Sequence, residues 1–121
     1  MIRSEEPLHV LFVCSRNQWR SPTAEKVFGR RGDLLVRSAG LASSARVRLG
    51  DAHLAWADIV FVMEESHREQ LRERHRAATR GKPVHVLDIP DEYGFMNEEL
   101  VAILEAAVTP ILEGYFDGGA S

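Results

Sequence analysis

Apolar residues along the chain form short runs that alternate with stretches in which they recur at helical spacing. Four runs are rich in β-branched and aromatic residues and end at turn residues, a pattern that predicts strands; they are LHVLFV (8–13), LLVRSAG (34–40), ADIVFVM (57–63) and PVHVLDI (83–89). Because neighbouring positions within each run are both apolar, both faces of the strands are expected to be covered, which is typical of a parallel sheet between helices.

Three longer stretches predict helices, over about 22–30, 64–79 and 97–116. The last has an apolar face and contains Pro110, where we expect a kink or a break; the face consists of Leu100, Val101, Leu104, Val108 and Ile111. The segment between the second and third strands has room for one small helix at most. Alternation of strand and helix predicts an α/β domain, a small doubly wound parallel sheet of about four strands flanked by helices.

Length and composition narrow the class of protein. The 121 residues are 45% hydrophobic, which suits one domain over 1–121 with loose termini at about 1–7 and 117–121. No run is long enough to span a membrane, no export signal opens the chain, and one cysteine cannot form an internal disulfide. We therefore expect a cytoplasmic protein. The net charge of -3 disfavours a nucleic-acid partner bound through a bulk positive field.

The junction of the first strand and first helix carries the chemistry. Cys14, the single cysteine, ends the strand, and Arg20-Ser21-Pro22 follows after five residues. Ser21 has the character of an N-cap and Pro22 that of a first helical residue. Cations are disfavoured beside the positive end of a helix, so Arg16 and Arg20 indicate that an anion binds there.

A bound oxyanion would also explain the cysteine. Backbone N–H groups of a tight loop and a forked guanidinium hold phosphate oxygens, and the same field favours a nucleophilic thiolate. A lone cysteine at a strand end is more often a small buried apolar side chain. That alternative does not explain the two arginines, so the combined pattern predicts phosphoryl transfer through Cys14.

The stretch VLFVCSRNQWRSPTAE resembles the loop of the low-molecular-weight protein tyrosine phosphatase family. RSAG (37–40), ADIVFVMEESHREQL (57–71) and DEY (91–93) extend the resemblance over most of the chain. It implies a phosphomonoester hydrolase that forms a phosphocysteine and needs no metal or other cofactor. By the same resemblance Cys14 is the nucleophile, Arg20 the transition-state clamp, Ser21 a hydrogen-bond donor to the thiolate, and Asn17 the residue that holds the loop in shape. We expect the substrate to be bound by Ser15, Arg16, Asn17, Gln18, Trp19 and Tyr93.

The reaction also needs a proton for the leaving oxygen. Three acids follow the fourth strand, Asp88, Asp91 and Glu92, and from the residues alone none is preferred. The position of the family's general acid falls on Asp91, with Asp88 as the principal rival. Tyr93 then takes the place of the aromatic wall of the pocket.

The sequence departs from the family pattern mainly around the substrate. Arg16 replaces a glycine, Trp19 a second loop cysteine, and Glu92 the proline after the acid, while Gly94 stands where many members have a second aromatic residue. Without a second cysteine, no protective disulfide can form, so Cys14 is expected to over-oxidise more readily. The segment between strands two and three is shorter than in typical members, so one pocket wall is expected to be low.

Other functions remain open at this stage. The same loop could reduce arsenate with an external small thiol, or bind phosphate or a phosphoprotein with little turnover. The five histidines show no metal-ligand spacing. Arg68, Arg72 and Arg76 form a stripe that is interpreted as a solvated helix face. The expected partners are a phosphorylated protein or a small phosphomonoester, and oxyanions such as phosphate, sulfate or vanadate.

Overall fold

The computed structural model describes residues 6–118 and contains one four-stranded parallel sheet. Its strands lie in the order β2-β1-β3-β4, with β1 at Leu8–Cys14, β2 at Leu34–Gly40, β3 at Ile59–Val62 and β4 at Val84–Val86. In register, Cys14 pairs with Gly40 and Val13 with Val62. The expected class, a small doubly wound α/β sheet, is confirmed.

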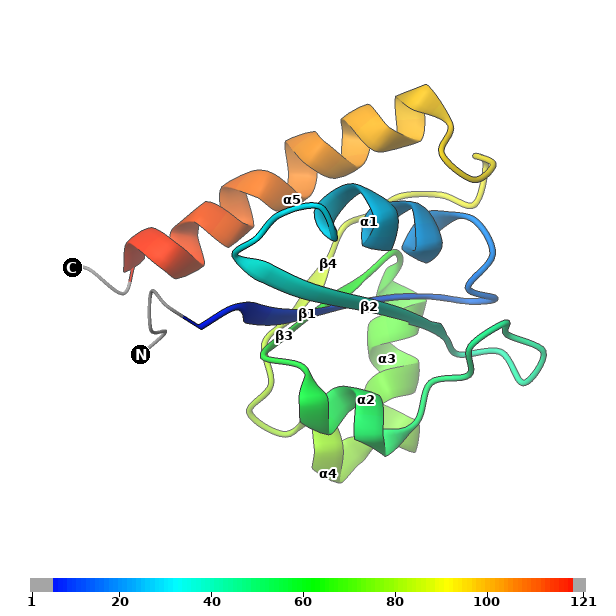
Figure 1. Cartoon of the computed structure of the whole chain (residues 1–121). Helices are drawn as coiled ribbons and strands as arrows, with labels where there is room; N and C mark the ends of the chain where they lie inside the picture. The colour runs from blue at the N-terminus through cyan, green and yellow to red at the C-terminus, as the bar shows by residue number, and fades with distance from the viewer. Residues whose placement is uncertain (1–5, 119–121) are drawn as a thin grey trace.

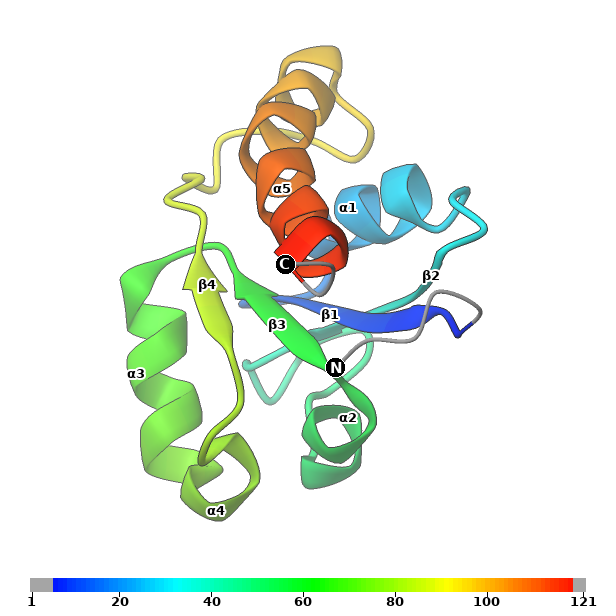
Figure 2. The ribbon, with the colours of Figure 1, turned by 90° about the vertical axis from the view of Figure 1, so that its left-hand side faces the viewer.

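Helices cover both faces of this sheet (Figures 1 and 2). Helices α1 (Arg20–Phe28) and α5 (Glu98–Gly118) lie on one face. Helices α2 (Asp51–Trp56), α3 (Glu65–Arg74) and α4 (Arg76–Thr79) lie on the other. No helix among residues 6–118 is both long and apolar enough to cross a membrane.

The apolar runs of the strands divide between two cores, because successive side chains of a strand point to opposite faces. From β1, Phe12 and Cys14 join the core under α1 and α5, whereas Leu11 and Val13 join the core above α2 and α3. This division explains why the central strands have no polar face. It also places the sulfur of Cys14 on the side of the sheet that carries α1.

Helix α1 begins two residues earlier than predicted, at Arg20, with Trp19 as its N-cap. The first intrahelical bond runs from the Thr23 N–H to the Trp19 carbonyl, at 3.1 Å. Pro22 therefore occupies the third helical position, where its missing N–H has no intrahelical partner to lose. The predicted N-cap role of Ser21 is wrong, since the first turn of α1 takes its side chain to the cysteine instead.

The two other long helices also differ from the prediction. The helix expected over 64–79 divides at His75, which leaves helical geometry at φ -131° and ψ 43°, and the His75 Nδ1 lies 2.6 Å from an Asp51 carboxylate oxygen of α2. Helix α5 is unbroken at Pro110, and the carbonyl of Ala106, which loses its partner, lies on the exposed side where water can solvate it. Its buried row is Leu100, Leu104, Val108 and Leu112, with Ile111 only half-buried.

The structure tests the predicted loose termini only in part. Residues 1–5 and 119–121 lie outside the described residues. Helix α5, however, continues through Gly118, so residues 117 and 118 belong to the helix. After β4, the Leu87 and Ile89 N–H groups still donate to carbonyls of the β3 side, at 2.9 Å each, which carries the next loop to the carboxyl edge of the sheet.

Candidate active site

Three strand ends meet at the carboxyl edge of the sheet, where ligands bind in open parallel sheets. Cys14 ends β1, Glu64 follows β3, and Ile89 to Asp91 follow β4. A cavity of about 40 Å³ opens there. Its lining among the described residues is Cys14, Arg16, Gln18, Trp19, Arg20 and Asp91.

The sulfur of Cys14 is buried and surrounded by hydrogen-bond donors. The Asn17 N–H lies 3.3 Å from Sγ, and the Ser21 hydroxyl lies 2.9 Å from it. Ser21 Oγ already accepts a bond from the Asn17 side-chain amide, at 2.9 Å, so its own hydrogen is free to point at the sulfur. Two donors directed at one sulfur stabilise a thiolate more than a thiol.

The shape of the loop depends on where its carbonyls point. The Ser15 carbonyl accepts from the Ala42 N–H at 2.8 Å, and the Arg16 carbonyl accepts from the Arg46 N–H at 3.0 Å. The Asn17 carbonyl accepts from Arg46 Nε at 3.1 Å. In a trans peptide the N–H points opposite to the C=O, so the N–H groups that follow these carbonyls turn toward the sulfur. The result is a nest that fits an anion.

Asn17 holds this turn from inside. It is fully buried and left-handed, at φ 56°, a conformation that asparagine adopts more readily than most residues. Its side-chain amide donates to both Ser21 Oγ and Ser38 Oγ at 2.9 Å, and Ser38 in turn donates to Glu25. Asn17 thereby connects β2, α1 and the loop beneath the sulfur.

The side chain of Arg20 is 2% exposed and contacts the segments that follow β3 and β4. One terminal nitrogen, Nη1, donates to Glu64 Oε2 at 2.5 Å and to the Ile89 carbonyl at 2.8 Å. Its Nε lies 3.7 Å from an Asp91 carboxylate oxygen. The hydrogen bond from Arg20 holds the pKa of Glu64 below its ordinary value, so Glu64 stays ionised and fixes the guanidinium.

The structure separates the three candidate acids. Asp91 is more than half exposed, lines the cavity and faces Arg20. Asp88 is left-handed, at φ 55°, and lines a different hollow with Glu64 and Glu65. Glu92 is exposed and does not belong to the cavity lining among the described residues. Of the three candidates, Asp91 is therefore the one that shares the cavity with Cys14 and Arg20.

Known proteins share both this sequence and this arrangement. No protein-family model matches the chain. This chain is 28% identical to low molecular weight protein-tyrosine phosphatase A of Mycobacterium bovis and to the protein of the same name from Mycobacterium tuberculosis. Each alignment has 158 positions and covers 93% of this chain and 93% of the relative. Wzb of Vibrio vulnificus, solved with benzylphosphonate, is 26% identical with a TM-score of 0.72, over 88% of this chain and 97% of Wzb. In sequence and in fold, the chain is similar to low-molecular-weight protein tyrosine phosphatases.

Two solved structures of lower sequence identity share the fold. Wzb of Escherichia coli K30, solved with phosphate, has a TM-score of 0.70 at 24% identity, over 87% of this chain and 96% of Wzb. The YwlE arginine phosphatase of Geobacillus stearothermophilus has a TM-score of 0.69 at 24% identity, over 90% of this chain and 96% of YwlE. These two structures support the fold, while the phosphatase class is supported by the curated relatives and by Wzb of Vibrio vulnificus.

The remaining predicted site residues fall into two groups. Arg16, Gln18 and Trp19 stand at the mouth of the cavity, and Trp19 is 46% exposed. Ser15 and Tyr93 do not line it among the described residues. The Ser15 hydroxyl binds His67, and Tyr93 packs half-buried against the core under α1 and α5. The role of Tyr93 as a pocket wall therefore stays a prediction.

Sequence reasoning missed two residues of this phosphatase site, Glu64 and His67. The Glu64 N–H donates to His67 Nδ1 at 3.1 Å, so in the neutral ring Nε2 carries the proton and donates to Ser15 Oγ at 2.9 Å. Both residues follow the third strand at the same edge as Cys14, which is the signal that could have identified them. Among the described residues no group of three or more His, Cys, Asp or Glu could hold a metal ion.

Gly40 is expected to tolerate no side chain. A Cβ there would lie 2.6 Å from the Ser15 carbonyl oxygen and 2.9 Å from the Asn17 nitrogen. Gly40→Ala should therefore push the loop outward, lowering the free energy of unfolding by about 1–3 kcal/mol and weakening phosphate binding. Denaturant unfolding and phosphate titration measure both effects. Gly32→Ala is the matched control, since a Cβ at Gly32 meets nothing within 4 Å; equal stability of the two variants would contradict the close contact.

His67 should make stability depend on pH. Burial, followed by the charge of Arg20, lowers the pKa of His67, so the unfolded chain binds the proton more readily than the folded one. The free energy of unfolding should then fall as pH drops below about 6.5, the ordinary histidine value. His67→Gln should flatten this slope between pH 7 and pH 5.5, leaving the part due to His85, whose pKa burial also lowers. The free energy of unfolding is measured by urea unfolding at each pH. The same dependence on pH in the wild-type protein and in His67→Gln would contradict this role.

Proposed function

We propose that this phosphatase hydrolyses aryl phosphomonoesters of the phosphotyrosine kind through a phosphocysteine on Cys14. The observation that supports the proposal best is the placement of three groups around one small cavity: the Cys14 sulfur at its base, the Arg20 guanidinium and the Asp91 carboxyl. A nucleophile, a fixed cation and a proton donor are what phosphoryl transfer needs. No step requires a metal ion.

The first step transfers the phosphoryl group to sulfur. The thiolate attacks phosphorus in line, the S–P bond forms as the P–O bond to the leaving group breaks, and Asp91 in its acid form gives that oxygen a proton. The inward N–H groups of the loop and Arg20 hold the three equatorial oxygens. The leaving group then departs as a neutral alcohol or phenol.

Arg20 has donors left for this task. A guanidinium carries five N–H groups, and Nη1 uses its two on Glu64 and Ile89. Its Nε and Nη2 have no hydrogen-bond partner among the described residues, so they can bind two phosphate oxygens as a fork. Glu64 thus orients the guanidinium without occupying the edge that meets the substrate.

The second step restores the enzyme. Asp91, now ionised, takes a proton from a water molecule whose oxygen attacks phosphorus, and the S–P bond breaks to give inorganic phosphate and the thiolate. The hydrogen bonds from Ser21 and Asn17 stabilise the sulfur as it leaves. Because the nucleophile is a free thiol, we also propose that the protein acts in a reducing compartment, the cytoplasm.

Cys14→Ser should abolish turnover of an aryl phosphate while the loop still binds oxyanions. The N–H nest and Arg20 remain, but serine lacks a nucleophile of comparable reactivity. Hydrolysis is followed by released phenol, and vanadate or phosphate binding by the fluorescence of Trp19 at the cavity mouth. Turnover that survives in the variant would overturn the covalent mechanism. Wild-type protein that binds phosphate without hydrolysing any ester would instead indicate a binding module.

Asp91→Asn should lower kcat by about 10²–10⁴-fold on a substrate with a poor leaving group, and by much less on one with an activated phenol. The amide cannot donate the proton, and only a basic leaving oxygen needs it. Asp88→Asn is the matched control, because Asp88 lines another hollow. Loss of activity in Asp88→Asn together with normal activity in Asp91→Asn would reverse the assignment.

The physiological substrate class needs a direct comparison. Some relatives are named tyrosine phosphatases and others arginine phosphatases, so a panel of phosphotyrosine, phosphoserine and phosphoarginine peptides separates the possible targets. We propose phosphotyrosine, since Trp19 offers an exposed aromatic face at the mouth of the cavity on which an aryl leaving group can stack.

A further inference from the structure

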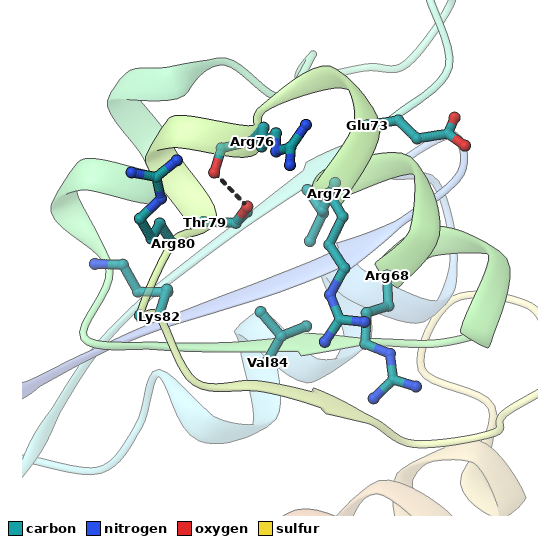
Figure 3. A pocket seen from close by; sticks show the side chains of 10 residues that line it. Arg68, Arg72, Glu73, Arg76, Thr79, Arg80, Lys82 and Val84 are labelled. Carbon is teal, nitrogen blue, oxygen red and sulfur yellow. Dashed lines mark hydrogen bonds between the residues drawn. The ribbon is translucent and has the colours of Figure 1, made fainter.

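A second, larger hollow lies on the face of the sheet that carries α3 and α4 (Figure 3). Its volume is about 750 Å³. We call it the basic hollow; the side chains that define it are Arg68, Arg72, Arg76, Arg80 and Lys82, over a floor of Leu71 and Val84. In Figure 3, Arg68 and Arg72 descend from α3 on one side of Val84, and Arg80 and Lys82 stand on the other.

Positive charge is concentrated here in a chain that is negative as a whole. Residues 68–82 contain six arginine and lysine side chains and two glutamates, while the net charge of the chain is -3. Arg68 is paired with Glu65. Arg72, Arg76 and Arg80 have no ion pair among residues 6–118, and Glu73 is the one acidic residue in the described lining. The cations therefore repel one another with little internal compensation.

The backbone that carries these cations is held in place. His75, between α3 and α4, bonds to Asp51 of α2, and Arg74 donates to the Leu41 carbonyl at 3.3 Å. Lys82 donates to the Ala57 carbonyl, which fixes the turn into β4. Beneath them Leu71 is fully buried. The arginines thus project from a fixed corner, so an anion bound between them would not have to order the backbone.

The basic hollow is separate from the active site. Glu64 and Glu65, at the start of α3, stand at the carboxyl edge with Cys14, whereas Arg80 and Lys82 precede β4 at the opposite edge. Among residues 6–118, none lines both cavities. A ligand in the hollow would therefore leave the catalytic loop free.

We propose that the basic hollow binds a compact polyanion that carries two or more linked phosphate groups. A volume of this size lies in the range of small-ligand sites, and guanidinium groups fork onto phosphate oxygens. Four or five cations around one hollow exceed the charge of a single phosphate but match that of a linear triphosphate. The triphosphate could be inorganic or part of a nucleotide, whose base would then rest on the apolar floor.

Triphosphate binding can be mapped on the whole ¹⁵N-labelled protein by amide chemical shifts. Inorganic triphosphate should shift amides of residues 68–84, and orthophosphate those of the loop after Cys14. Arg72→Gln/Arg76→Gln should weaken triphosphate binding at 68–84 about tenfold or more, since two charged hydrogen-bond donors are lost. Turnover of an aryl phosphate should be unchanged, which also shows that the variant is folded.

Arg30→Gln/Arg48→Gln is the matched control, because it removes the same charge from two exposed arginines outside the hollow. It should retain the affinity within about twofold. Binding of ATP with an affinity equal to that of inorganic triphosphate also supports the site. A higher affinity for ATP would show in addition that the base contacts the apolar floor. Triphosphate shifts confined to the catalytic loop, equal losses in the two variants, or binding of an acidic peptide or oligonucleotide but not of triphosphate would each overturn the proposal. None of these outcomes depends on the catalytic role of Cys14.

Discussion

The site depends on the direction of three peptide groups. The carbonyls of Ser15, Arg16 and Asn17 all bind outward, to Ala42 and Arg46, and this alone turns the following N–H groups toward the sulfur. A loop of the same sequence without the segment after β2 would have no reason to keep its carbonyls away from an incoming anion. The left-handed backbone conformation of Asn17 and the absence of a side chain at Gly40 belong to the same arrangement, since both allow the loop to lie against β2.

Arg20 connects this nest to the rest of the molecule. Its buried guanidinium contacts Glu64 after β3, and Ile89 and Asp91 after β4, so one side chain aligns the nucleophile with the acid. A buried cation is costly unless it is paired and hydrogen-bonded. Glu64 satisfies that requirement and remains ionised because Arg20 lowers its pKa. The charge that the substrate needs is therefore stabilised before the substrate arrives, which is the condition for electrostatic catalysis without reorganisation.

Local patterns predicted the parts of the structure that local physics controls. The second strand, at 34–40, matches its predicted range, because a short apolar run between turns has no competing structure. The loop from Cys14 to Arg20 was found from the conflict between arginines and a helix start. The sequence did not predict the roles of Glu64 and His67, because these roles require β3 to lie beside β1. Hydrophobic spacing predicts strands but not their order in the sheet. For the same reason, hydrophobic spacing could not predict that His75, at the break between α3 and α4, contacts Asp51, or that Tyr93 packs against the core.

The small size of the cavity limits what it can select. A space of about 40 Å³ lined by Cys14, Arg20 and Asp91 takes a phosphoryl group, so we infer that the leaving group lies outside it. Arg16 and Trp19 line its mouth, and Gln18 also borders a neighbouring groove of about 500 Å³ with Arg46 and the exposed Phe95. The short segment after β2 thus has two effects at once. It supports the loop through Arg46, and it leaves the mouth of the cavity to exposed side chains, which lie apart from the buried hydrogen bonds around the sulfur.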